Sequence, residues 1–117
     1  MSEHFGLEVS ELASGEIRLL VSGELDLESA PQLLDAILCS GLANEPGVRI
    51  VVELQDVSFI DSSGLAALVE AHHRIAQQEQ ELLLGRLSER VARILSIAGL
   101  DQVIGTDERP ADESRAS

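Results

Sequence analysis

The sequence has 117 residues, the size of one domain that buries roughly two-thirds of its unfolded surface. Its formal net charge is −13, from 21 acidic and 8 basic side chains, and this balance argues against nucleic acid or an anionic membrane as the partner. None of the basic residues is lysine, which excludes a P-loop lysine, a Ser–Lys nucleophile pair and a Schiff-base enzyme.

Targeting signals are not expected in this chain. No run of residues approaches the ~20 apolar side chains of a membrane span, and residues 1–6 lack the basic and apolar layout of a signal peptide. The single cysteine, Cys39, cannot form an internal disulfide, which suits a reducing compartment. We therefore expect a cytoplasmic protein in which Cys39 is a small core residue of a helix.

The first half of the chain predicts two strands and a helix. Alternating residues indicate strands at 7–12 and 16–22, joined by a turn that contains Gly15. From Ser29 the period becomes helical, with Ser29 as the predicted cap and Pro31 in the first turn. The apolar face of this helix should consist of Leu33, Leu34, Ile37, Leu38 and Leu42.

The second half alternates strands with helices. A near-continuous apolar run at 48–54 predicts a strand covered on both faces, followed by a helix from about 62 to 78 and a short strand at 81–85. Ser88 should cap a third helix that ends at Gly99, with a last strand at 102–104. Residues 106–117 are polar and acidic, so we expect a disordered tail after a domain at 1–105.

The apolar positions of the later helices are also predicted. In the second helix they are Leu65, Leu68, Val69, His72 and Ile75 or Ala76, and in the third they are Val91, Ile94, Leu95 and Ala98. Strands that alternate with helices imply right-handed crossovers and an at least partly parallel sheet. The predicted fold class is therefore α/β.

The most informative segment is the run DVSFIDSSGL at residues 56–65. A strand there leads directly into a helix, so Asp61, Ser62 and Ser63 lie at the first helical turn, where backbone N–H groups are unpaired. Such a terminus favours a Ser or Asp cap and tolerates an added phosphate. Phosphorylation of a hydroxyl there changes the local charge by almost two units, which predicts a switch.

Three segments resemble the STAS domain family (sulphate transporter and anti-sigma factor antagonist), in particular its small stand-alone anti-sigma factor antagonists. They are DVSFIDSSGL, Gly23-Glu24-Leu25-Asp26 followed by Ala30-Pro31, and Leu87-Ser88-Glu89-Arg90-Val91 through Ala98-Gly99-Leu100. They occur in the family's order over residues 7–105. The resemblance implies a single STAS-type domain with a central four- to five-stranded mixed sheet, an N-terminal antiparallel hairpin and three main helices packed against the sheet.

The resemblance also implies site residues. In these antagonists the serine directly after the aspartate of the motif accepts phosphate from a partner kinase, and that residue is Ser62 here, with Ser63 as the secondary candidate. The partner-binding surface would contain Asp26, Asp61, Ser62, Ser63 and Gly64. Gly64 allows a close backbone approach, either to the sheet or to a docked partner. The chain has Ala66-Ala67 where a second glycine often follows the leucine, which makes the partner-facing surface bulkier.

Plainer interpretations stay open for the same residues. Ser62 can be only the N-cap of the second helix, and Asp26 and Asp61 can be only caps of their turns. The two aspartates follow strands that should be neighbours, but no substrate pocket signature accompanies them, which disfavours acid–base catalysis. His72 and His73 are adjacent on a helix and diverge by about 100°, so they do not chelate one metal. A G-x-S-x-G nucleophile elbow is absent from the sequence.

The resemblance implies a bacterial transcription regulator without enzymatic activity or cofactor. Its unphosphorylated form would bind an anti-sigma factor that is also a serine kinase, and so release the sigma factor. Phosphorylation of Ser62 would end binding, and a phosphoserine phosphatase would restore it. We expect a monomer or weak dimer. The alternatives are an unswitched STAS subunit of a lipid-transport ABC complex and a component of a stress-sensing multiprotein assembly.

Overall fold

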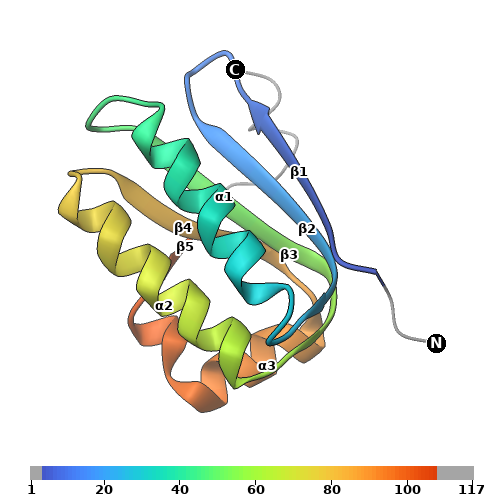
Figure 1. Cartoon of the computed structure of the whole chain (residues 1–117). Helices are drawn as coiled ribbons and strands as arrows, with labels where there is room; N and C mark the ends of the chain where they lie inside the picture. Colours follow the sequence, from blue (N-terminus) through green and yellow to red (C-terminus); the bar gives the residue numbers. More distant parts are fainter. Residues whose placement is uncertain (1–3, 108–117) are drawn as a thin grey trace.

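The computed structural model describes residues 4–107 of the chain. Its elements are β1 (Gly6–Glu11), β2 (Ile17–Leu25), α1 (Ala30–Leu42), β3 (Arg49–Ile60), α2 (Ser62–Gln77), β4 (Glu81–Leu87), α3 (Glu89–Ala98), a 3-10 turn (Leu100–Gln102) and β5 (Gly105–Thr106). The strands form one sheet in the order β1-β2-β3-β4-β5 (Figure 1). Only the β1–β2 pair is antiparallel. This arrangement confirms the predicted α/β fold, with its mixed sheet, N-terminal hairpin and three helices.

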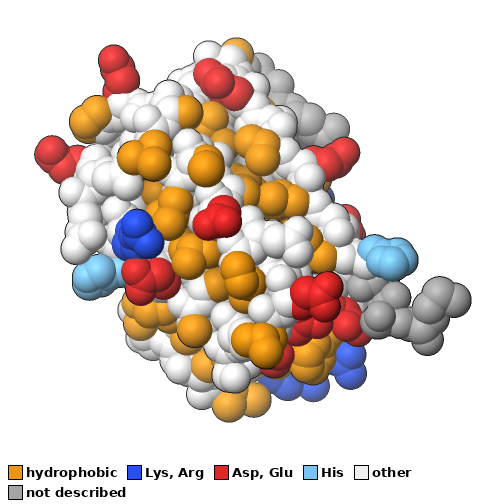
Figure 2. All heavy atoms as spheres, in the orientation of Figure 1, with side chains coloured by type: hydrophobic (Ala, Val, Ile, Leu, Met, Phe, Trp, Pro, Cys, Tyr) orange, Lys and Arg blue, Asp and Glu red, His pale blue; other side chains and the backbone are white. Residues whose placement is uncertain are grey.

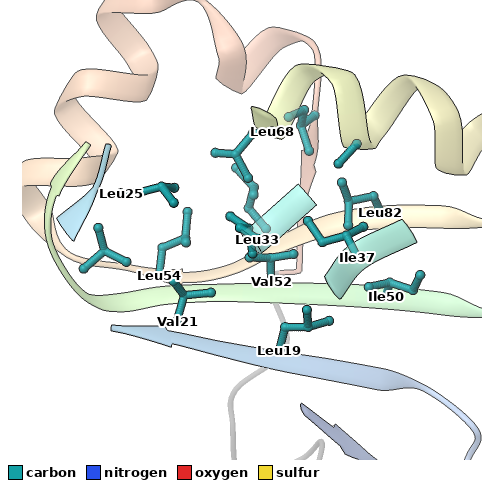
Figure 3. Packing of buried hydrophobic residues seen from close by; sticks show 14 of the residues in the cluster. Leu19, Val21, Leu25, Leu33, Ile37, Ile50, Val52, Leu54, Leu68 and Leu82 are labelled. Atoms are coloured by element: carbon teal, nitrogen blue, oxygen red, sulfur yellow. The ribbon is translucent and has the colours of Figure 1, made fainter. Parts of the chain in front are cut away.

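The core lies between the sheet and the two helices α1 and α2, which run side by side over one face (Figure 1). Alternate residues of a strand point to opposite faces of the sheet. In β2 and β3 the side chains that point toward the helices are apolar. Figure 3 shows where these side chains meet those of the helices. The buried cluster includes Leu19, Val21, Leu25, Leu33, Ile37, Ile50, Val52, Leu54, Leu68 and Leu82.

Strand β3 is longer than the apolar run at 48–54 predicted, because it continues to Ile60. Gln55 and Asp56 are exposed and interrupt the apolar pattern, yet Asp56 still pairs with Ser22 of β2. The pairing of β2 with β3 is irregular on both sides of Ser22 and Gly23, and Gly23 adopts a φ of 87° there. A glycine is suited to this left-handed conformation. The irregularity lets both strands end together, at Leu25 and Ile60.

The last strand is also displaced from its predicted place. Gly99 ends α3, as predicted, with a φ of 81°. The expected strand at 102–104 does not form, because Gln102 ends the 3-10 turn and residues 103 and 104 form a turn and a bend. The strand that joins β4 is instead Gly105–Thr106. The expected boundary of the domain after residue 105 is therefore too early, since Thr106 pairs with Leu84 and Asp107 N–H donates to Leu84 O. Residues 108–117, where disorder is expected, lie outside the described residues.

Several residues expected in the core are exposed. Leu42 is 76% exposed, Val69 is 38% exposed, and Cys39 and Ala98 are also exposed. The helices bury narrower faces than their apolar patterns suggested. α1 and α2 pack on each other as well as on the sheet. In α2 that double contact places small residues inside, namely Gly64, Ala67 and Ala71.

The sheet face opposite α1 and α2 carries a buried ion-pair cluster that the sequence analysis missed. Arg18 is 7% exposed and bonds Glu16, Glu53 and Asp107, at 2.8, 2.8 and 2.6 Å. Glu53 also accepts Arg86 Nε at 3.1 Å. We call these five residues the Arg18 cluster. Burial alone would raise the pKa of Glu53, but hydrogen bonds from Arg18 and Arg86 outweigh it and lower that pKa.

Candidate functional site

The candidate site lies where β2 and β3 end. Leu25 and Ile60 are register partners, so the next residue of each strand, Asp26 and Asp61, begins a turn at the same edge of the sheet. Asp61 N–H donates to Leu25 O at 3.2 Å and ties the two turns together. The predicted proximity of the two aspartates is confirmed. We call the two turns, residues 26–29 and 61–64, the carboxyl edge.

Asp61, and not Ser62, is the N-cap of α2. Its backbone is extended (φ −110°, ψ −171°), and its Oδ1 accepts Ser63 N–H at 2.8 Å and Gly64 N–H at 3.2 Å. The interpretation of Ser62 as a cap is therefore wrong. A cap requires a non-helical, extended backbone, and Asp61, one residue before Ser62, has that conformation. Ser62 is the first helical residue, its side chain is exposed, and its hydroxyl has no hydrogen bond within residues 4–107.

The turn of Asp26 is also closed locally. Asp26 Oδ1 accepts the N–H groups of Glu28 and Ser29, each at 3.1 Å, and the bond from Ser29 N–H lowers the pKa of Asp26. Ser29 is 3% exposed, and its hydroxyl donates to Glu24 O at 2.7 Å and accepts Asp26 N–H at 2.9 Å. Ser29 occupies the N-cap position of α1, but the prediction that its side chain caps the helix is wrong. The hydroxyl fastens the turn to β2 instead.

Gly64 supports the edge from beneath. It is buried, and a Cβ at this position would lie 2.8 Å from both Ile60 Cγ1 and Leu25 O. Any larger residue would push α2 away from the ends of β2 and β3. Of the two uses that the sequence left open for Gly64, the structure shows the close approach to the sheet. Ser63 is half-buried beside it and Ser62 points outward.

Two large apolar side chains at this edge were not singled out from the sequence. Leu27 is 77% exposed in the middle of the Asp26 turn, and Phe59 is 42% exposed near the end of β3. For Leu27 the sequence did contain a signal. It is an apolar residue between two acidic ones in a capping turn, and the predicted core has no place for it. α3 contributes a cation to this edge, because Arg90 Nη1 donates to Ser58 O at 3.3 Å. Arg90 and Arg93 are both exposed.

Residues 4–107 contain no group of three or more His, Cys, Asp or Glu side chains placed to hold a metal ion. His73 is exposed and His72 is half-buried, as their adjacent positions on α2 predicted. No helix within the same range has the length and apolar content needed to cross a membrane.

A phosphate on Ser62 would change the surface of the carboxyl edge. The N–H groups of Ser63 and Gly64 are already used by Asp61, so a phosphate on Ser62 would compete with a carboxylate for the helix terminus. It would therefore face outward and add about −1.5 to −2 charges beside Asp61. A phosphate on Ser62 would thus replace a neutral hydroxyl at this edge by a strongly anionic group.

Comparison with protein families and curated relatives places this edge in context. Residues 12–113 match the family model described as STAS domain. The anti-sigma-B factor antagonist of Listeria monocytogenes is 32% identical over 101 residues, which cover 86% of this chain and 87% of the relative. The anti-sigma-B factor antagonist of Bacillus subtilis is 37% identical over 89 residues, which cover 76% of this chain and 79% of the relative.

Solved structures share the fold. An anti-sigma factor antagonist from Mycobacterium paratuberculosis superposes with a TM-score of 0.80 at 23% identity, covering 97% of this chain and 95% of the other. SpoIIAA in its unphosphorylated form has a TM-score of 0.73 at 18% identity, covering 92% and 91%. The Bacillus cell fate determinant SpoIIAA in its phosphorylated form has a TM-score of 0.68 at 17% identity, covering 96% and 100%.

Proposed function

The chain belongs to the STAS domain family, and from that premise we propose that it is an anti-sigma factor antagonist switched by phosphorylation of Ser62. Its unphosphorylated form binds an anti-sigma factor with serine kinase activity, and this binding releases the sigma factor. The kinase then transfers the γ-phosphoryl group of ATP to the Ser62 hydroxyl, and the phosphorylated form dissociates. A separate phosphatase hydrolyses the phosphoserine and restores binding.

The position of Ser62 carries the proposal. Its hydroxyl is exposed at the first residue of α2. Asp61 caps the helix, so the Ser62 hydroxyl is not needed as a cap. A free hydroxyl on a rigid helix terminus is a suitable phosphoryl acceptor. Two further observations add support: the relatives that cover most of this chain are named anti-sigma-B factor antagonists, and SpoIIAA is known in both phosphorylated and unphosphorylated forms.

The switch follows from charge and shape. A partner surface that fits a neutral hydroxyl must accept a bulky dianion after phosphorylation, next to Asp61 and close to Asp26. Such a mismatch in a buried interface costs about 2–4 kcal/mol, or roughly 30- to 1000-fold in affinity. The catalytic groups and ATP belong to the kinase, and this chain supplies the acceptor and the docking surface.

The names of the relatives favour this function over the alternatives. A permanently bound STAS subunit of a lipid-transport complex would need no phosphoryl acceptor, and no feature of the described residues points to a membrane-associated ATPase. A role within a large stress-sensing assembly would use the same serines. Co-purification with an ABC-type ATPase, or elution of the native protein in a large particle, would favour those alternatives.

The experiment that tests the proposal uses the purified anti-sigma factor kinase of the same organism. With ATP, one phosphate should appear on Ser62, with Ser63 at most a minor site, as shown by mass spectrometry of tryptic peptides. Ser62→Ala should bind the kinase and remain bound whether or not ATP is present. Ser62→Asp should bind at least 30-fold more weakly. Both variants should fold as well as the wild type, because Asp61 retains the cap.

A matched control is available one residue away. Ser63→Ala should keep phosphorylation of Ser62, since only the backbone N–H of Ser63 contributes to the cap. Equal affinity of Ser62→Asp and wild type, with both folded, would reduce Ser62 to an ordinary helix residue and would rule out the electrostatic switch.

A further inference from the structure

An apolar groove of about 370 Å³ lies between the amino-terminal halves of α1 and α2. Pro31 and Leu34 line it from α1, Ala66 from α2 and Leu27 from the turn before α1, while Glu70 is the charged member of the lining. Figure 2 shows the corresponding surface, where hydrophobic side chains gather over α1 and α2 with acidic side chains among and around them. The helices themselves leave this surface uncovered.

The groove is continuous with the carboxyl edge. Leu27 directly follows Asp26, and Ser63, which lines the groove, directly follows Ser62. Leu27 is 77% exposed, which leaves a large apolar side chain in water at the mouth of the groove. Apolar surface of this kind, bordered by polar groups, is typical of a protein–protein contact. A partner that reaches Ser62 therefore also meets this groove.

The charges around the groove indicate the chemistry of its occupant. Glu70 lines it, and its cationic neighbour Arg74 lies 4.0 Å away in an ion pair with it. Glu28 and Asp35, which follow Leu27 and Leu34 in the chain, are both exposed. Together with the formal net charge of −13, these residues favour an occupant that carries arginine or lysine beside its apolar side chain.

We infer that this groove receives an apolar side chain of leucine or methionine size from a basic segment of the anti-sigma factor kinase, while Ser62 is presented for phosphorylation. The inference rests on the function proposed above and adds a second contact that does not involve the phosphoryl acceptor. Ala66 is the residue that determines which side chain fits, because its small exposed side chain leaves the groove open. A larger residue there would fill it.

The chain offers a matched pair of variants for the test. Ala66 and Ala76 are both exposed residues of α2, but Ala76 lies near the end of the helix and outside the groove. Ala66→Leu should weaken binding of the purified anti-sigma factor kinase about 10- to 100-fold in isothermal titration calorimetry, and Ala76→Leu should change it less than about twofold. Circular dichroism and thermal unfolding of both variants check that each remains folded.

Two additional measurements test the apolar and the charged parts of the inference. Leu27→Ala should weaken binding about 10-fold, because the exposed leucine would lose its contact with the kinase. Glu70→Gln should reduce the dependence of the affinity on salt concentration, since one attractive charge is removed from the interface. Ser62 should still be phosphorylated in both variants when the kinase concentration is raised.

The outcomes separate this inference from the proposed function. If Ser62 is phosphorylated and Ser62→Asp loses binding, but folded Ala66→Leu binds like Ala76→Leu, the groove is not a contact and the inference is wrong while the switch stands. If the wild-type chain neither binds the kinase nor accepts phosphate from it, both proposals fail. Weaker binding of Ala66→Leu without a salt effect in Glu70→Gln would overturn the basic character of the occupant.

Discussion

The two polar clusters of this molecule, the carboxyl edge and the Arg18 cluster, use acidic side chains in opposite ways. At the carboxyl edge, Asp26 and Asp61 accept backbone N–H groups two and three residues ahead of them. In the Arg18 cluster, carboxylates meet guanidinium groups, and the side chains of Arg18, Glu16 and Glu53 are less than 10% exposed. The first cluster is local and partly exposed, whereas the second has a buried centre and includes pairs that are far apart in the sequence.

Under the proposed function, the difference separates recognition from stability within one small domain. Carboxylates that accept hydrogen bonds from their own turns stay near the surface, so they would present a defined shape to the partner and tolerate a change of charge next to them. Buried charges must be paired, and removing one partner leaves the others without compensation. We therefore expect the fold to tolerate a phosphate at the carboxyl edge, and we expect substitutions in the Arg18 cluster to lower its stability. Four predictions test that comparison.

Loss of the central cation should have the largest effect. Arg18→Ala would leave the carboxylates of Glu16 and Glu53 buried beside each other, and we expect the free energy of unfolding to fall by about 3–5 kcal/mol. Urea denaturation followed by circular dichroism measures the change. Adding Glu53→Gln to this variant should recover part of the loss, because a neutral amide is less costly to bury than a carboxylate whose remaining cationic partner is the exposed Arg86. A loss below about 1 kcal/mol would show that the cluster behaves like exposed ion pairs.

Acid should weaken the same cluster. The pKa of Glu53 is lowered in the folded protein, so its carboxylate stabilises the fold above the ordinary glutamate range, and this stability is lost as the pH falls through the lower folded pKa. The unfolding free energy of the wild type should therefore fall as the pH drops below about 4.5. Arg18→Ala lacks this pairing, so its stability should approach that of the wild type as the pH falls. A constant difference across the pH range would contradict the assignment.

Removal of the C-terminal member of the cluster should have an intermediate effect. Asp107→Ala removes a carboxylate bonded to Arg18, and we expect a loss of about 1–3 kcal/mol in chemical denaturation. Deletion of residues 108–117 should preserve folding and partner binding, because we expect that segment to be a tail. A loss of more than about 2 kcal/mol in the truncated protein would show that the domain extends beyond residue 107.

The smallest effect is expected at the carboxyl edge, where one pair of variants identifies the cap. Asp61→Ala should lower the unfolding free energy by about 1 kcal/mol, because Ser63 and Gly64 lose the acceptor of their N–H groups. Ser62→Ala should stay within about 0.5 kcal/mol of the wild type, since its hydroxyl has no structural bond within residues 4–107. Thermal denaturation of both variants measures the difference, and the reverse order would make Ser62 the cap.

Local sequence determined a large part of this protein. Hydrophobic periodicity predicted the order of strands and helices, since helices and strands place apolar residues on one face with different periods. Asp26, Ser88 and Gly99 act in their own turns, so short stretches of sequence suffice to predict their roles as caps and stops. The candidate phosphoacceptor Ser62 was found because the run DVSFIDSSGL is itself contiguous.

Only the tertiary structure decided the features that join distant residues. Arg18 pairs with Glu53 and Asp107, which are 35 and 89 residues away, and no local pattern distinguishes these side chains from exposed charges. The choice of Asp61 over Ser62 as the cap depended on where β3 ends, which pairing with β2 sets at Ile60. The groove beside Ser63 exists because two helices, each amphipathic on its own, pack at a distance that small residues allow. Sequence periodicity predicts which face of a helix is apolar, but packing decides how much of that face remains uncovered.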